Sequence, residues 1–186
     1  YRLFCKDIMK LKFFPIVLGM VFYLLSHYAF GQDFSIKKKY RDWNVYSSSS
    51  SECFLASKAK RTTSYFNSRE ILGKNRQNSF IYLSINKNNN NYSMSYFSDY
   101  PLKNNAPGTM NIDNKKILEL TTINSNEPSG SKHAILYGLS KEDINLLFTG
   151  RRLTMELQGI DNSKLVDQFS LMGFTKSFNY LFSSCN

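Results

Sequence analysis

The chain has 186 residues, of which 24 are Lys or Arg and 14 are Asp or Glu, giving a formal net charge of +10. This length is enough for one domain with a packed core. Because no internal repeat emerges from the sequence, we expect one domain and not a repeat array or several domains. A basic protein is drawn toward anionic partners. The basic residues can equally form a solvent-exposed face that binds no partner.

The N-terminal part of the chain predicts a secretory signal peptide. Met9 precedes two lysines, an apolar run from Phe13 to Leu25, and the small-residue signal Ala29-Phe30-Gly31. This order is that of a leader cleaved on export. An uncleaved anchor is the alternative, but spanning a bilayer takes about 20 apolar residues and this run has 13. We expect upstream residues at 1–8, the leader at 9–31, a flexible segment at 32–40 and one folded domain at 41–186.

Export would change both the charge and the cysteine count. It leaves 20 basic and 13 acidic residues, a net charge of about +7, and two cysteines, Cys53 and Cys185. In an oxidising compartment an even pair is expected to form a disulfide. Two unpaired thiols are the alternative; a metal pair is disfavoured because His133, the one histidine after the leader, neighbours neither cysteine.

Most of the remaining chain has the composition and period-two alternation of short strands. Phe80–Ile85 is the strongest, because it is β-branched and aromatic throughout, and an Asn-rich turn joins it to Tyr92–Phe97. Trp43 and Val45 are expected to face inward. Further strands are expected over 42–46, 53–57, 109–112, 117–122, 134–137, 153–157 and 166–171, with a polar loop over 69–78.

Two short helices are expected toward the C-terminus. Ser140 is a candidate N-cap, because Glu142 and Asp143 follow in the first turn, where carboxylates meet the positive end of a helix. Gly150 is expected to end this helix. Residues 174–182 place apolar side chains on one helical face. Together with the strands, this pattern predicts a mainly β fold, an immunoglobulin-like β-sandwich with two short helices.

No active site is evident in the sequence. A catalytic triad needs a histidine beside a nucleophile, and His133 lies in a polar loop, flanked by Lys132 and Ala134. The sequence has neither the spacing of zinc ligands nor a phosphate-binding glycine motif. No cofactor is expected. Paired carboxylates could still hydrolyse a glycosidic bond, so an envelope hydrolase is the alternative to a non-catalytic protein. The carboxylates Asp99, Asp113, Glu119 and Asp167 are assigned to turns or to outward strand positions.

Basic clusters are the candidate binding residues. We expect contacts with an anionic envelope or host surface, including peripheral association with a membrane, or with a protein partner. Nucleic acid is not expected, because export removes it as a partner and the many aromatic residues alternate inward along strands, toward the core. The candidate contacts are Lys58, Lys60, Arg61, Arg151 and Arg152.

Several segments together resemble the invasion-associated locus B family. They are Asp42-Trp43-Asn44-Val45-Tyr46, Cys53-Phe54-Leu55-Ala56-Ser57-Lys58, Asp167-Gln168-Phe169-Ser170-Leu171-Met172-Gly173-Phe174-Thr175 and the terminal Cys185. The Tyr100-Pro101 turn and the helix at Glu142–Leu147 fit the same pattern. Their order and spacing match over nearly all of the chain after the leader.

This resemblance implies an exported α-proteobacterial protein, periplasmic or associated with the outer envelope, with an immunoglobulin-like sandwich and no known catalysis. Pathogenic members are associated with host-cell entry, so a surface factor promoting invasion is a further alternative.

The sequence departs from the family pattern at two places. Ser47–Ser51 stands where some members carry another cysteine, so one disulfide is expected, and Ile160–Leu165 replaces an arginine-containing loop, so contacts of that arginine are not carried over.

Overall fold

The computed structural model describes residues 35–47, 53–71, 76, 78–86, 91–121 and 134–184, all within one compact unit, 34–186. The predicted leader, His133 and Cys185 lie outside these residues. Within them, no helix combines the length and the apolar character needed to cross a membrane.

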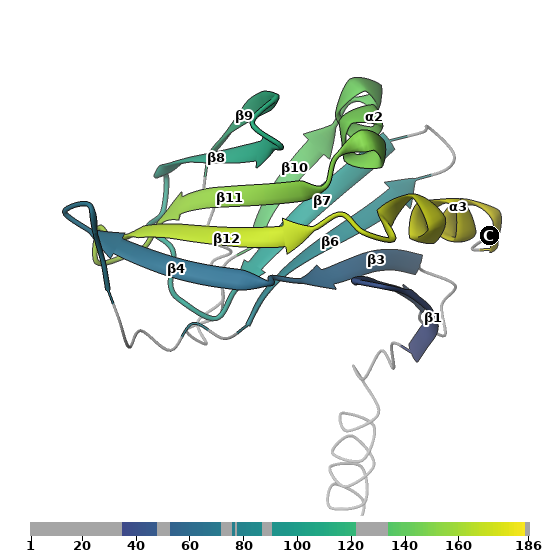
Figure 1. Ribbon diagram of the computed structural model, residues 1–186, viewed down its shortest axis with the longest axis horizontal. Coiled ribbons are helices and arrows are strands. Elements are labelled where there is room, and N and C mark those ends of the chain that lie inside the picture. The colour runs from purple at the N-terminus through teal and green to yellow at the C-terminus, as the bar shows by residue number, and fades with distance from the viewer. Residues whose placement is uncertain are drawn as a thin grey trace, which may run out of the picture. The chain divides into compact units, whose positions relative to one another are not determined.

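The fold consists of two six-stranded antiparallel sheets (Figure 1). Sheet A has the order β1-β2-β3-β6-β7-β10 and sheet B has the order β5-β4-β12-β11-β8-β9. The predicted mainly β sandwich with two short helices is confirmed. Sheet A is built from β1 (Ser35–Tyr40), β2 (Trp43–Ser47), β3 (Cys53–Lys58), β6 (Ser79–Asn86), β7 (Asn91–Ser98) and β10 (Ala134–Leu139). Sheet B is built from β4 (Arg61–Phe66), β5 (Arg69–Glu70), β8 (Pro107–Ile112), β9 (Lys116–Thr121), β11 (Arg152–Gln158) and β12 (Lys164–Ser170).

The core lies between the sheets because alternate side chains of each strand point inward. Trp43 and Val45 are fully buried, as predicted, and Leu55, Ile81 and Leu83 continue this inner face across sheet A. Sheet B contributes a matching inner face of Met110, Ile112, Leu153, Met155, Leu165 and Phe169. The hairpin expected from the Asn-rich turn is confirmed for β6 with β7. Antiparallel pairs are also formed by β2 with β3, β8 with β9 and β11 with β12.

Two helices, α2 (Lys141–Thr149) and α3 (Phe174–Ser184), lie at the same end of the sandwich (Figure 1). The α2 N-cap is Ser140, as predicted: its Oγ accepts from the Asp143 amide at 3.1 Å, and Asp143 Oδ2 accepts from the Ser140 amide at 2.9 Å. This reciprocal capping box satisfies backbone donors that the first helical turn leaves unpaired. The predicted apolar face of α3, which includes Phe174 and Phe178, is buried.

The segment 32–40 was expected to be flexible, and this is wrong for Ser35–Tyr40, which form β1. Its register pairs Tyr40 with Trp43, and its side chains are almost all exposed. A strand that buries no side chain shows no apolar alternation, so its backbone pairing with β2 leaves no trace in the sequence. Lys37–Lys39 suit an edge strand, where charge discourages pairing with another chain.

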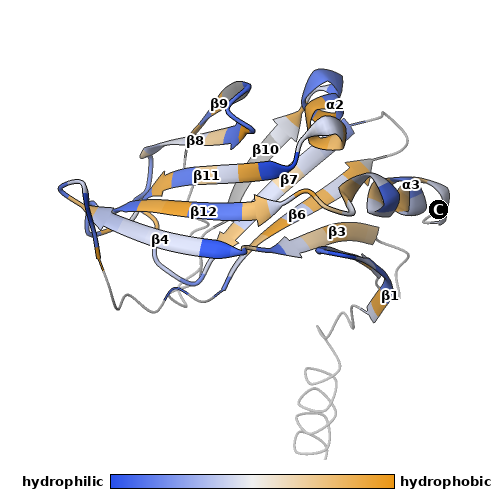
Figure 2. Ribbon diagram, in the orientation of Figure 1, coloured by the Kyte–Doolittle hydropathy of each residue, from blue (hydrophilic) through white to orange (hydrophobic). Residues whose placement is uncertain are grey.

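Strand β4 is the second element that the sequence analysis missed. The sequence Arg61–Phe66 is largely polar, and in Figure 2 β4 is drawn in white and blue along most of its length. It pairs with β12 from Arg61↔Gln168 to Tyr65↔Lys164. Its Thr and Tyr residues suit a pleated, half-buried surface. The expected polar loop over 69–78 begins with β5, a two-residue strand paired with β4.

Candidate functional site

The first group of predicted basic residues lies where the chain crosses from sheet A to sheet B. Lys58 ends β3 and is exposed, with its Nζ 5.9 Å from the centroid of the Phe80 ring. Lys60 Nζ forms an ion pair with Asp42 Oδ1 at 2.5 Å. Hydrogen bonds from Lys60 and, second, from Ser170 lower the pKa of the Asp42 carboxyl. Asp42 therefore partly neutralises Lys60.

The other predicted basic residues reach sheet B. Asp113, in the β8–β9 turn, accepts the backbone N–H groups of Arg151 and Arg152 at 2.7 and 2.9 Å, which fixes the start of β11. Arg152 points to the outer face of sheet B, as does Arg61 on β4, and β12 runs between them. Of the five predicted contacts, Lys58 lies on the outer face of sheet A and Arg61 and Arg152 lie on that of sheet B, while Lys60 and Arg151 lie in the loops before β4 and β11.

A small basic pocket, which the sequence analysis missed, lies beside the β3–β4 crossover. It has a volume of about 390 Å³ and is lined by Lys39, Tyr40, Arg41, Gly173, Thr175 and Lys176. Three of these residues are cations and none is acidic. Nothing in the local sequence groups them, because β1, the β1–β2 turn and α3 meet here only through the fold. The backbone N–H of Asp42 donates to the carbonyl of Met172 at 3.3 Å and joins the two segments.

The strands of sheet A have an unbalanced charge. They contain four lysines, Lys37–Lys39 and Lys58, and no Asp or Glu. Within this sheet no carboxylate can therefore neutralise a lysine. All the charged side chains that these strands carry are therefore positive, which favours association with an anionic group.

Five aromatic side chains form a continuous row on the outer face of sheet A, which we call the aromatic stripe. Successive ring centroids lie 5.1, 5.7, 6.3 and 6.2 Å apart, and the first pair is stacked with an interplanar angle of 10°. All five rings are partly exposed. In order across the sheet they are Tyr46, Phe54, Tyr82, Phe80 and Phe97.

The expectation that the aromatic residues alternate inward is wrong for this stripe. In β6, Ile81 and Leu83 take the inner positions, which leaves Phe80 and Tyr82 on the outer face. Burial raises the pKa of the Tyr82 hydroxyl. The alternation of aliphatic with aromatic residues along β6 separates the two faces of this strand. Because both kinds of residue are apolar, the alternation does not show which face is the core.

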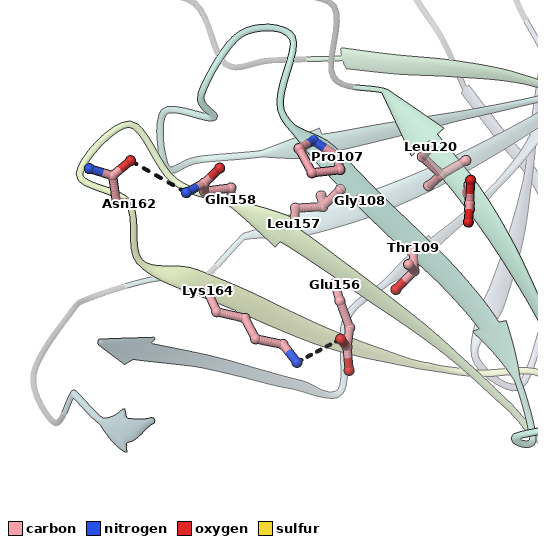
Figure 3. A pocket seen from close by; sticks show the side chains of 10 residues that line it. Pro107, Gly108, Thr109, Leu120, Glu156, Leu157, Gln158, Asn162 and Lys164 are labelled. Carbon is pink, nitrogen blue, oxygen red and sulfur yellow. Dashed lines mark hydrogen bonds and ion pairs between the residues drawn. The ribbon is translucent and has the colours of Figure 1, made fainter. Parts of the chain in front are cut away.

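A groove on the outer side of sheet B has a volume of about 780 Å³ (Figure 3). Glu119 of β9 and Glu156 of β11 both lie opposite Thr109 of β8, so their backbones are two strand spacings, about 10 Å, apart. Lys164 Nζ forms an ion pair with Glu156 Oε2 at 2.7 Å. The groove is open, and both carboxylates are exposed to solvent.

A polar cluster is buried between the sheets. Arg76 Nη2 donates to Asp167 Oδ2 at 2.7 Å, and the Tyr96 hydroxyl donates to the same oxygen at 2.5 Å. Arg76 Nη1 also donates to the Thr63 carbonyl at 3.0 Å. Asp167 is 1% exposed, so its expected outward position is wrong. The sequence misleads here because Asp167 shares the inner face of β12 with Leu165 and Phe169, while Val166 points outward.

The predicted disulfide remains a prediction. Cys53 opens β3, and α3, which packs against β1, β2 and β3, ends at Ser184. Cys185 itself lies outside the described residues. The contact of α3 with β3 is compatible with the pairing of Cys53 with Cys185.

The two sheets and the helical end define the class of the protein as a two-sheet β-sandwich. No protein-family model and no curated sequence matches the chain. Among solved structures, the fold is similar to invasion associated protein B from Bartonella henselae, with a TM-score of 0.60. The match covers 80% of this chain and 97% of that one at 14% identity. The fold of this chain is therefore similar to that of the Bartonella protein, which agrees with the resemblance seen in the sequence.

Proposed function

We propose that this chain is an exported, non-catalytic protein of the bacterial cell envelope that binds an anionic partner through the basic pocket and the neighbouring β3–β4 crossover. The observation that carries the proposal is the lining of the basic pocket, where Lys39, Arg41 and Lys176 gather without an acidic residue. Such a concave group of cations favours phosphate, sulfate or carboxylate groups.

The surroundings of the pocket support the same reading. Lys58 and Lys60 lie at the adjoining crossover, and the sheet A strands carry no carboxylate that would repel an anion. Arg61 and Arg152 continue the positive charge onto the outer face of sheet B. A partner larger than the pocket could therefore contact the basic residues of both sheets at once.

Binding assays with two anionic probes test the proposal. Vesicles of phosphatidylglycerol present lipid phosphates, and polygalacturonate presents sugar carboxylates; phosphatidylcholine vesicles are the control for the lipid. We expect binding to at least one anionic probe that weakens steeply as salt is raised, because screening acts on exposed charges. Binding to neither probe, or binding that salt leaves unchanged, would contradict the proposal.

Substitutions locate the anionic contact. The double variant Arg41→Gln, Lys176→Gln should weaken binding by about tenfold, since an exposed ionic contact contributes up to about 1 kcal/mol. The double variant Arg69→Gln, Lys115→Gln is the matched control, because it also removes one arginine and one lysine from exposed positions, on β5 and in the β8–β9 turn, and neither residue lines the basic pocket. Equal losses from both variants would mean that net charge alone, and not this pocket, governs binding.

Export and location require a separate experiment. Fractionation of the source bacterium with N-terminal sequencing of the purified protein should place the protein in the periplasm or outer envelope, with Gln32 as the first residue. A cytoplasmic protein that keeps residues 9–31 would contradict this part of the proposal.

The groove on sheet B favours one second candidate, a glycoside hydrolase that uses Glu119 and Glu156. Their backbones lie about 10 Å apart on one face of the sheet. From there the two carboxyl groups could reach the separation of about 6.5–9.5 Å at which those of inverting enzymes flank a water molecule. Exposure and the ion pair to Lys164 weigh against the candidate, because an enzyme places its acid and base in a site that excludes water. Reducing-end release from polysaccharides that is lost in both Glu119→Gln and Glu156→Gln would favour hydrolysis over simple binding.

A further inference from the structure

We propose that the outer face of sheet A binds an acidic polysaccharide, whose sugar rings stack on the aromatic stripe while its anionic groups pair with Lys58. This inference rests on the proposed function, because it takes the protein as a binder of anions and names the class of its partner. It adds a second binding element, the stripe, to the cations described above.

The geometry of the stripe suits an elongated, ribbon-like ligand. Its rings come from four neighbouring strands, β2, β3, β6 and β7, so the row spans three strand spacings, about 14 Å. The centroids follow one another at 5.1 to 6.3 Å without a break. A sugar ring presents C–H groups on its faces, and these pack against aromatic rings in the same way as other apolar groups do.

Hydroxyl groups border the stripe and supply the polar half of such a contact. Ser84 of β6 and Ser93 of β7 point outward with their Oγ atoms 2.7 Å apart, and Ser95 takes the next outward position of β7. The two tyrosines of the stripe, Tyr46 and Tyr82, add phenolic hydroxyls. Flat rings with a few polar groups beside them offer both the apolar and the hydrogen-bonding contacts that a sugar chain needs.

The positive charge of sheet A favours an acidic sugar chain over a neutral one. Lys58 lies over the Phe80 ring, the fourth of the five, and shares the outer face of sheet A with the stripe. The basic pocket lies apart from the stripe, at the β1–β2 turn and the start of α3. The absence of Asp and Glu from the sheet A strands leaves nothing to repel carboxylate, sulfate or phosphate substituents. A neutral sugar chain would gain nothing from these cations.

A membrane surface fits this face less well. Insertion into a bilayer needs side chains that protrude, whereas the five rings are each partly covered and contact one another along the row. The large exposed apolar side chain on this side is Ile36, at 57% exposure, on edge strand β1. Binding to vesicles through the stripe is thus the competing outcome that the experiment must separate.

The experiment compares polygalacturonate with its fully methyl-esterified form, which keeps the sugar rings and loses the charge. Tyr82→Ala interrupts the stripe at its centre, where Tyr82 contacts both Phe54 and Phe80. We expect it to weaken polygalacturonate binding by about tenfold, the loss of one good aromatic contact. Tyr82→Phe, which retains the ring, should bind within about twofold of the wild type. Phe66→Ala is the matched control, because Phe66 is an exposed aromatic residue on sheet B.

Each outcome separates the stripe from the proposed function. Loss of polygalacturonate binding in Tyr82→Ala, with unchanged binding in Tyr82→Phe and Phe66→Ala and weak binding of the esterified polymer, supports the inference. Unchanged binding in Tyr82→Ala overturns it, while salt-sensitive binding that depends on Arg41 and Lys176 would leave the proposed function standing. Equal binding of both polymers overturns the requirement for charge. Loss of vesicle binding in Tyr82→Ala, without any polygalacturonate binding, assigns the stripe to membranes and also overturns the inference.

Discussion

The backbone of Gly173 lies directly against the carbonyl oxygen of Tyr40, with no space for a side chain between them. This contact seats the start of α3 on the β1–β2 turn, where Phe174 packs edge-on against Trp43 with centroids 4.9 Å apart. Trp43 Nε1 donates to the carbonyl of Ser170 at 3.0 Å. The Asp42–Tyr46 and Ser170–Thr175 segments, which carry the sequence resemblance, therefore contact each other in the fold.

The first prediction concerns this contact. Gly173→Ala should lower the free energy of unfolding by about 3 kcal/mol, because its Cβ would collide with the Tyr40 carbonyl and its φ of +93° disfavours any side chain. Urea denaturation followed by tryptophan fluorescence measures the change through Trp43. Gly138→Ala is the control, since a Cβ there meets nothing within 4 Å. Similar losses in both variants would show that the close approach at Gly173 is not what stabilises this junction.

The second prediction concerns the buried ion pair. Asp167→Ala should cost about 3–5 kcal/mol of unfolding free energy, because it leaves Arg76 charged and buried without its partner. Glu156→Ala removes a Lys–Glu pair with the same 2.7 Å separation at the surface, and should cost less than about 1 kcal/mol. The two values from urea denaturation should differ severalfold. Equal costs would mean that burial does not govern the contribution of the pair.

These residues also show how far the sequence predicts the structure. The alternation of apolar residues located most strands, and Ser140 with Asp143 located a helix start, because both signals are local. The buried Asp167 and the outward aromatic stripe are not predicted for one reason: which face of a strand is the core depends on the strands beside it. Strand β4 is not predicted because its sequence is largely polar. The basic pocket was missed because Lys39, Arg41 and Lys176 meet only after the two ends of the domain come together.

The third prediction is a dependence of stability on alkaline pH. Burial first, and then the charge of Asp167, raise the pKa of the Tyr96 hydroxyl above its ordinary value of 10.0. Above pH 10 the unfolded chain therefore releases this proton while the folded protein keeps it. Fewer protons are bound by the unfolded state, so the free energy of unfolding falls as pH rises. Below pH 10 the contribution is fully present.

Tyr96→Phe isolates this effect, because it removes the titrating hydroxyl and keeps the ring against Phe169. The variant should be less stable at neutral pH, since Asp167 loses a buried hydrogen bond worth about 1–2 kcal/mol. Its stability should then decline less steeply than that of the wild type from pH 10 upward, as measured by urea denaturation at a series of pH values. Parallel declines would assign the alkaline loss to other groups.

The fourth prediction is the disulfide between Cys53 and Cys185. The bond would enclose a loop of more than 130 residues, and closing a loop of that length stabilises the fold by about 4–5 kcal/mol in the chain-entropy model. Cys53→Ser, Cys185→Ser and the double variant should all lose the same amount, because each removes one and the same bond. Additive losses would instead indicate two independent packing contributions.

The intact protein should weigh less than its reduced form by the two hydrogens lost on oxidation, and a reducing agent should lower its unfolding midpoint to that of the variants. Identical masses before and after reduction would refute the pairing, and α3 would then be held on sheet A by contacts such as that of Phe174 with Trp43 alone.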